Sequence, residues 1–286
     1  MDSLPVAWAY AVVAGLFAVL VVLEAARPLR RTVEPRPGRI TRNLGLGGLG
    51  LALLSLLQAP LLLPVAEWAR RHDFGLLNRV GLPRGAEIAL AVLLLDYTLW
   101  HWHWLTHRVP FLWRFHLVHH VDLDLDASTA LRFHFGELAL SVPYRLMQVA
   151  VIGADPSAVA LWQLLLVAAI LFHHSNLRLP WGVERVLVRL VVTPRMHGIH
   201  HSDYENETNS NWSSLLSAWD YLHGTLVLSV PQRAVSVGVP TYGDPREVTL
   251  GKVLALPFRK QREVWRDADG RIRRRDHPAP TARLAE

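Results

Sequence analysis

The sequence contains no cysteine among its 286 residues. This absence excludes disulfide bonds, cysteine nucleophiles, thiolate-ligated haem and cysteine-ligated iron–sulfur clusters within the chain. Any redox-active metal must therefore be held by histidine, aspartate or glutamate side chains.

Several common catalytic motifs are also missing. The chain has no HExxH pattern of zinc proteases, no GxSxG pattern of serine hydrolases and no phosphate-binding P-loop. A glycine-rich run at residues 45–50 resembles a dinucleotide-binding motif, but it opens an apolar stretch and no strand precedes it. We interpret this run as a site of close helix packing through small residues.

Charged residues make up only 19% of the chain, whereas hydrophobic residues reach 51%. The formal net charge is +6, from 30 Lys and Arg against 24 Asp and Glu. The arginines cluster beside apolar segments and in the carboxyl-terminal tail, which anionic lipid headgroups explain better than nucleic acid. The composition predicts an integral membrane protein, and we expect no nucleic-acid partner.

Three apolar stretches, at residues 6–26, 44–66 and 86–104, are predicted to cross a bilayer. Two more, at residues 138–153 and 156–172, are separated by only two residues and predict a helical hairpin that enters the membrane and returns. The first stretch lacks a basic region before it and a cleavage site after it, so we expect a retained helix rather than a signal peptide.

A proline-broken loop with six arginines, between residues 27 and 42, follows the first stretch. The positive-inside rule places this loop in the cytoplasm and the amino terminus outside. Counting crossings from there puts most histidines and the carboxyl terminus in the cytoplasm. We therefore expect an all-α, polytopic membrane helical bundle with a cytoplasmic, histidine-rich helical cap, located in a bacterial inner membrane.

This topology divides the chain into three regions. Residues 1–89 would hold amino-terminal transmembrane helices and the arginine-rich cytoplasmic loop. Residues 90–226 would form the histidine-rich domain with the transmembrane hairpin, and residues 227–286 a polar cytoplasmic tail that is partly disordered.

Histidine is the most informative residue type, since thirteen of the fifteen lie between His101 and His223. Residues three and four apart share one helix face, so a histidine group at that spacing can direct two or three imidazoles at one point. Two such clusters could surround two metal ions. The groups are His103-x3-His107, His116-x2-His119-His120, Arg132-x-His134, His173-His174 and His197-x2-His200-His201.

Neutral imidazole suits iron, zinc, copper and nickel, and iron and zinc are the main candidates from chemistry alone. We expect the isolated His72 and His277 to be ordinary hydrogen-bonded residues. Ligand and structural roles both stay open for His101, His173 and His223.

Two carboxylates accompany the histidines. Asp96 lies inside an apolar stretch, almost two helical turns before His103, and Glu137 lies one turn after His134. Each is expected either to accept a hydrogen bond from a ligand imidazole or to form a buried ion pair.

The order and spacing of these elements resemble the fatty acid hydroxylase and sterol desaturase superfamily of membrane di-iron proteins. The resemblance covers roughly residues 90–226, and Val121 and Trp212-Ser213 depart from the usual pattern near the expected substrate entrance. The matching elements are Asp96-Tyr97, His103-x3-His107, Leu112-Trp113, His116-x2-His119-His120, Arg132-x-His134-x2-Glu137, His174-Ser-Asn176, Pro194-x2-His197-x2-His200-His201-Ser202, Asn211, Trp219-Asp220 and Gly224-Thr225.

The resemblance implies a domain that holds two irons, binds O2 and hydroxylates or desaturates a lipid, with zinc as a possible substitute metal. Electrons are expected from a separate ferredoxin- or flavin-type protein, because no haem-binding cytochrome segment is fused to the chain. The implied metal ligands are His103, His107, His116, His119, His120, His134, His174, His197, His200 and His201. The implied catalytic residues are Asp96, Glu137, Asn176 and Asp220.

Two other functions would also use a histidine-rich face. A metal transporter or metal-binding membrane protein would place its ligands near the bilayer midplane, whereas these groups lie at or beyond the predicted helix ends. A membrane zinc hydrolase would need a carboxylate base, which Asp96 or Glu137 could supply. The lipid itself stays open among sterols, fatty acyl chains, sphingoid bases, ether lipids and carotenoids, as does hydroxylation against desaturation.

Overall fold

The computed structural model describes residues 6–267, 269–276 and 284–285. Within these ranges the chain is helical, with short 3-10 turns and isolated β-bridges but no strand. This confirms the predicted all-α class. The α-helices are α1 (Val6–Ala26), α2 (Arg36–Leu57), α3 (Ala59–Arg71), α4 (Arg84–Arg108), α5 (Pro110–His120), α6 (Phe135–Ile152), α7 (Pro156–His174), α8 (Trp181–Leu187), α9 (Pro194–His200), α10 (Glu205–Thr208), α11 (Ala218–His223) and α12 (Leu250–Ala255).

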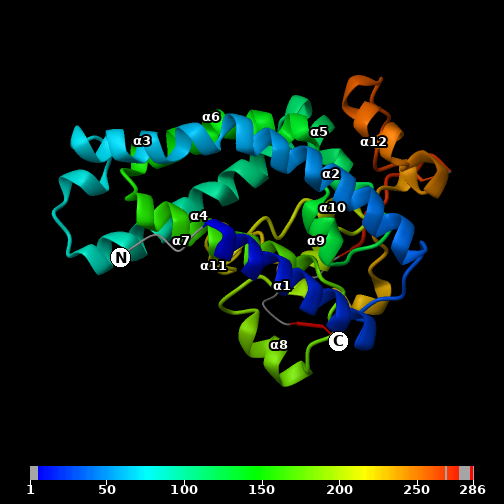
Figure 1. The fold of residues 1–286 in the computed structure, drawn as a ribbon. Coiled ribbons are helices and arrows are strands. Elements are labelled where there is room, and N and C mark those ends of the chain that lie inside the picture. The colour runs from blue at the N-terminus through cyan, green and yellow to red at the C-terminus, as the bar shows by residue number, and fades with distance from the viewer. Residues whose placement is uncertain (1–5, 268, 277–283, 286) are drawn as a thin grey trace.

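The long helices form an elongated bundle, and the short ones gather at one end of it (Figure 1). Helix α6 packs along both α2 and α3, while α4 packs against α6 and α7, and α1 lies on α7. A buried core that includes Leu95 of α4, Val149 of α6 and Trp162 of α7 joins these helices. We call the end with the short helices the cap.

Three helices are long and apolar enough to cross a membrane, namely α1 from Trp8, α2 and α7. The described part of α4 and α6 is also helical, as predicted, but neither helix is in this set. Both carry ionisable side chains within their apolar runs, among them Asp96 in α4 and Arg145 in α6.

The predicted span at residues 44–66 was wrong in one respect, because it is not a single helix. Helix α2 ends at Leu57, and α3 starts at Ala59 after Gln58. Pro60 has no N–H to continue the α-helical hydrogen-bond ladder, which accounts for the break. The interpretation of the glycine run is confirmed: a β-carbon on Gly50 would lie 2.6 Å from Leu138 Cδ1 of α6.

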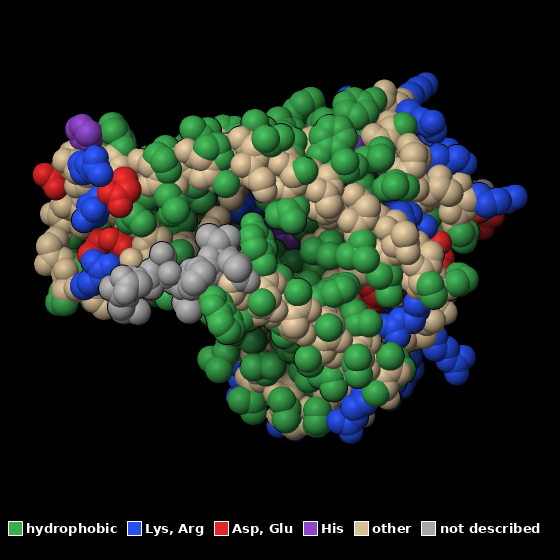
Figure 2. Space-filling view, viewed as in Figure 1, with side chains coloured by type: hydrophobic (Ala, Val, Ile, Leu, Met, Phe, Trp, Pro, Cys, Tyr) green, Lys and Arg blue, Asp and Glu red, His purple; other side chains and the backbone are tan. Residues whose placement is uncertain are grey.

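Charged side chains gather at the two ends of the molecule, and hydrophobic side chains cover much of the surface between them (Figure 2). Large apolar residues on this surface face outward, such as Leu56, which is 75% exposed, and Val151. An outward apolar belt between polar ends is what contact with lipid chains requires.

The arginine-rich loop corrects another expectation. Arg39 is buried, and internal partners also bind three of its neighbours, so lipid headgroups are not needed to explain these four charges. The contacts are Arg30–Gln232, Arg36–Glu24, Arg39–Asp122 and Arg42–Glu34.

The segment after residue 226 folds back over the cap. Val239, Tyr242 and Val253 pack in one buried cluster with Leu117 and Val118 of α5. The proline- and alanine-rich end that we expected to be disordered falls largely outside the described residues, as does His277.

Candidate metal centre

Nine histidines converge in the cap in two groups, within each of which the ligand nitrogens lie within 4.8 Å of one another. Helices α5 and α9 contribute to both groups, whereas α4 contributes only to the first and α7 only to the second. The first group is His103, His107, His116, His120 and His200, and the second is His119, His174, His197 and His201.

In both helices the two histidines that are four residues apart stay together, and the third histidine joins the other group. In α5, His116 and His120 are four residues apart and share a face, while His119 points to the neighbouring face and the second group. In α9 the pair His197 and His201 joins the second group, and His200 joins the first. Two short helices thus stand between two candidate metal positions and supply ligands to both.

In the second group, the ring nitrogens approach one another directly. The Nε2 atom of His174 lies 3.0 Å from Nε2 of His119 and 3.0 Å from Nε2 of His197, and Nε2 of His201 lies 3.1 Å from Nε2 of His197. Two nitrogen ligands at right angles on a metal with bonds of about 2.1 Å would be separated by about 3.0 Å. The four nitrogens are therefore spaced as ligands of one ion.

The first group has the same character. Nε2 of His116 and Nε2 of His120 are 3.2 Å apart. Nε2 of His107 and Nε2 of His200 are buried without a hydrogen-bond partner. An unpaired buried polar atom is costly, and a metal ion bound by these lone pairs would remove the cost.

In three of the nine rings, a hydrogen bond to a backbone carbonyl fixes which nitrogen faces the centre. Nδ1 of His103 donates to the carbonyl of Trp212 at 2.7 Å, and Nδ1 of His200 donates to the carbonyl of Ser210 at 2.7 Å. Nδ1 of His174 donates in the same way to the carbonyl of Ile170 at 2.8 Å. Because a carbonyl oxygen only accepts, a neutral ring keeps its Nε2 lone pair for the centre, as metal-binding histidines do.

The surroundings also keep these imidazoles neutral. Burial lowers the pKa of His119, His120, His200 and His201 well below the ordinary value, and the neighbouring histidine rings lower it further. A neutral ring offers a lone pair, whereas a protonated ring cannot bind a cation.

His134 does not join either group, which departs from its predicted role as a ligand. It is the N-cap of α6, where its Nδ1 accepts from the Gly136 N–H at 2.9 Å, and its Nε2 donates to the carbonyl of Leu254 at 3.2 Å. Both ring nitrogens are thus used by the backbone, which leaves none for a metal.

Three histidines for which both roles stayed open also lie outside the groups. The ring of His223 stacks on Trp100 with centroids 4.0 Å apart, and His101 meets the edge of the same indole. His173 lies beside His197 with ring centroids 4.0 Å apart, but it belongs to neither group.

Glu137 takes the first of its two predicted roles. Its Oε1 accepts a hydrogen bond from Nδ1 of His116 at 2.8 Å, so it orients a candidate ligand and favours the tautomer with Nε2 free.

Asp96 takes neither predicted role, because none of its hydrogen bonds or ion pairs among the described residues is to an imidazole or an arginine. Its Oδ2 accepts from the indole N–H of Trp219 at 2.6 Å and from the backbone N–H of Leu216 at 3.1 Å. The carboxylate therefore anchors the segment before α11 to α4 rather than touching the metal centre.

Asp220 affects the centre indirectly, through the backbone of Trp212. Its carboxylate accepts from the backbone N–H groups of Trp212 and Ser213 at 3.1 and 2.9 Å and from the indole of Trp100 at 3.0 Å. These bonds position the Trp212 carbonyl that receives the hydrogen bond from His103. Asp220 is therefore a positioning residue.

Asn176 is also structural. Its side chain exchanges hydrogen bonds with the backbone of Arg30, at 2.9 and 2.8 Å, and so ties the end of α7 to the loop after α1.

A buried ion network beside the centre was not predicted from the sequence. Asp122, Asp124 and Asp126 follow the histidines of α5 at alternate positions, and the guanidinium of Arg39 lies among them. Burial alone would raise the pKa of Asp122, but Arg132, Arg39 and Arg42 hold it below the ordinary value. The signal in the sequence was three spaced aspartates and an arginine at the edge of an apolar stretch.

A cavity of about 100 Å³ lies beneath the histidine groups, between α4, α6 and α7. Its walls include His103, His116 and His174 together with apolar side chains such as Leu99 and Ile170. A reactive carbon placed there would lie against both groups and away from bulk water.

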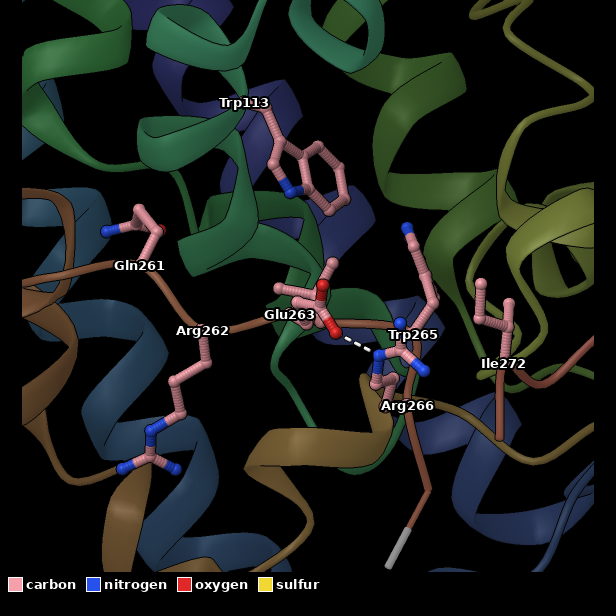
Figure 3. A pocket seen from close by; sticks show the side chains of 8 residues that line it. Trp113, Gln261, Arg262, Glu263, Trp265, Arg266 and Ile272 are labelled. Atoms are coloured by element: carbon pink, nitrogen blue, oxygen red, sulfur yellow. Dashed lines mark hydrogen bonds and ion pairs between the residues drawn. The ribbon is translucent and has the colours of Figure 1, made fainter. Parts of the chain in front are cut away.

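A second pocket of about 290 Å³ lies on the outer side of Trp113, under residues 261–266 (Figure 3). The indole of Trp113 separates this pocket from the first group, because its ring centroid lies 5.0 Å from that of His107 and 5.4 Å from that of His120.

Residues 88–225 match the model of the fatty acid hydroxylase family. The chain is 26% identical over 260 residues to ornithine lipid hydroxylase OlsE of Rhizobium tropici, which covers 89% of this chain and 76% of that protein. It is 29% identical over 143 residues to cholesterol 25-hydroxylase of Mus musculus, or 49% of this chain and 47% of that one.

Alkylglycerol monooxygenase of Xenopus tropicalis is 28% identical over 138 residues, which is 48% of this chain and 30% of that protein. The chain thus spans less than half of the mouse and frog relatives and about three quarters of the rhizobial one. No solved structure matches it.

Proposed function

Because the chain belongs to the fatty acid hydroxylase and sterol desaturase superfamily, we propose that it is a membrane di-iron oxygenase that hydroxylates a lipid. It is an oxidoreductase, since the relatives above are named hydroxylases or monooxygenases. Their names also favour hydroxylation over desaturation.

The observation that carries this proposal is the pair of all-histidine groups, in which the Nδ1 atoms of four rings are held by the backbone or by Glu137. Nine imidazole nitrogen donors in two groups suit two ions of the iron, zinc, copper or nickel type. Hydroxylation by O2 consumes two electrons and two protons and releases water, so the metal must change oxidation state. Zinc is redox-silent, and the resemblance to a di-iron family favours iron among the redox-active metals.

The two histidine groups would hold two irons, which would supply the activation of O2, and the protein provides the remaining requirements. The histidines hold the ions, Glu137 and the carbonyls of Trp212 and Ser210 fix the rings, and the cavity presents a C–H bond of the lipid beneath them. Apolar walls from α4, α6 and α7 exclude water from the oxidant.

The two alternative functions have less support. A transporter would need ligands along a path through the spans, whereas both groups lie together in the cap. A zinc hydrolase has less support from the comparisons, because the relatives above are named hydroxylases or monooxygenases.

We propose that the cap and the carboxyl terminus lie in the cytoplasm of a bacterium, with the amino terminus outside. Exposed arginines and lysines concentrate at the cap, whereas the opposite end has both signs of charge. The positive-inside rule favours this orientation.

Purified chain should hold about two irons and, once reduced, should consume one O2 for each lipid hydroxylated. Iron would be measured by elemental analysis and oxygen uptake with an electrode, using membrane lipid extracts as the substrate. Full activity in a preparation that contains zinc and no iron would contradict the oxygenase proposal.

We further propose that electrons enter at Trp113. Its indole stands between the first histidine group and Trp265, whose ring centroid lies 5.9 Å away at the surface pocket (Figure 3). Exposed Arg259, Lys260 and Arg271 have no ion pair within the described residues and favour an acidic electron donor of the ferredoxin or flavin type.

Trp113→Leu should slow reduction of the irons by such a donor, because it removes the aromatic ring between the surface pocket and His107. Reduction by dithionite should keep its wild-type rate, since a small reductant does not need the docking surface. Stopped-flow spectroscopy measures both rates. Phe111→Leu, an exposed aromatic on the same helix, is the matched control and should change neither.

A further inference from the structure

Arg145 of α6, in the wall of the cavity beneath the histidine groups, forms no close ion pair within the described residues. Its Nε is buried and has no hydrogen-bond partner. The only specific contact that the described residues give it is with the ring of Trp162, whose centroid lies 5.9 Å from Cζ. Arg145 is partly buried, whereas the fully buried arginines Arg39 and Arg132 have carboxylates beside them.

An unpaired guanidinium in an apolar helix bundle is costly, because arginine stays charged at any physiological pH. A charged residue in such a place usually has a function, and the group that a guanidinium would bind is an anion or an oxygen-rich group. The position of Arg145 supports this. Glu137, Ser141 and Arg145 recur every four residues on one face of α6, and all three line the cavity.

The cavity is also accessible from the side of the bundle. Figure 2 shows a hollow between the α2–α3 arm and α1, with basic and histidine side chains at its floor. Ligand pockets that enclose a whole small molecule hold about 300–1,000 Å³. At about 100 Å³, this cavity has room for only part of a lipid, and the rest must extend through the hollow.

We propose that Arg145 binds an anionic group of the substrate, a carboxylate or a phosphate, and that the oxidised C–H bond lies close to this group. The inference rests on the proposed function and names its substrate class: a lipid whose charged end enters the cavity while its chain stays outside. Guanidinium binds both anions through two parallel hydrogen bonds. Side chains on a helix lean toward its amino end, which directs Arg145 toward Glu137 and the histidine groups.

One rival explanation is that Arg145 only balances the charge of Glu137, whose Oε2 is also buried and unpaired. In that case removing the arginine would disturb Glu137 and its hydrogen bond to His116. It would lower the iron content and would affect charged and neutral lipids alike.

The test measures binding rather than turnover, with oxidised, iron-loaded chain in a non-ionic detergent. The probes are radiolabelled palmitic acid, monohexadecyl phosphate and 1-hexadecanol, which share a chain and differ in the head. Wild type should bind the acid or the phosphate roughly tenfold or more tightly than the alcohol, as expected for a charged hydrogen-bonded pair. The anion that binds more tightly, the carboxylate or the phosphate, identifies the headgroup chemistry.

Arg145→Met should remove this preference and leave alcohol binding and iron content unchanged, and Arg145→Lys should keep part of it. Arg71→Met, at an exposed arginine of α3, is the control and should leave the preference intact. Equal binding of the three probes by wild type would overturn the proposal, as would equal loss of all three together with iron in Arg145→Met. Anion preference in a chain that consumes no O2 would instead refute the oxygenase function.

Discussion

His119→Ala should reduce lipid hydroxylation by more than about 100-fold, because even residues that only support a metal ligand change metal affinity or activity by roughly 10–100-fold. Nε2 of His119 lies 3.0 Å from Nε2 of His174 in the second group, and its removal leaves three donors there. The iron content should fall from about two to about one per chain, since the first group is intact. Elemental analysis of the purified variant measures this directly.

The same substitution should leave membrane insertion unchanged, because α5 is not one of the helices suited to cross the bilayer. His134→Asn is the matched control: it keeps a side-chain acceptor at the N-cap of α6 and should retain both irons. The iron content of Glu137→Gln should lie between those of His119→Ala and His134→Asn, because iron binding at the first group is weakened. Wild-type iron and activity in His119→Ala would remove that residue from the centre.

The histidine groups could be predicted because their geometry is local. Spacings of three and four residues predict that these rings gather on helix faces, but they do not predict the division of His119 from His116 and His120 between two groups. The resemblance to a known family then supplied the order of the motifs. The all-α class followed from the same apolar stretches.

What could not be predicted depends on contacts between distant segments or on backbone detail. Trp212 and His103 are far apart in the chain, so the carbonyl that fixes this ring has no local signature. His134 has the residue type of a ligand but sits where a helix begins, and its ring is used as a cap. The spacing of Asp96 and His103 places them on one helix face. In the structure, however, the Asp96 carboxylate accepts a hydrogen bond from the indole of Trp219.

The ion network around Arg39 is the clearest case of such long-range information. Arg39 donates to Asp122 Oδ2 at 2.9 Å, to the carbonyl of Asp124 at 3.3 Å, and to Asp126. It thereby joins the start of α2 to the loop that follows His119 and His120. The placement of the α5 histidines thus depends on a residue outside the matched family region, which begins at residue 88.

Arg39→Met should destabilise the protein by about 3–5 kcal/mol, because it leaves buried carboxylates without their cation. Thermal unfolding of purified protein in detergent measures the loss. Arg70→Met should cost less than about 1 kcal/mol, since the Arg70–Glu67 pair is exposed on α3.

The triple variant Arg39→Met, Asp122→Asn, Asp126→Asn separates the charge effect from lost packing. If uncompensated charge is the cause, neutralising the two aspartates should recover a large part of the stability lost in Arg39→Met. Iron content should recover with it, because the loop after α5 would again pack against α2. An Arg39→Met protein as stable as wild type would show that this network does not hold the cap to the bundle.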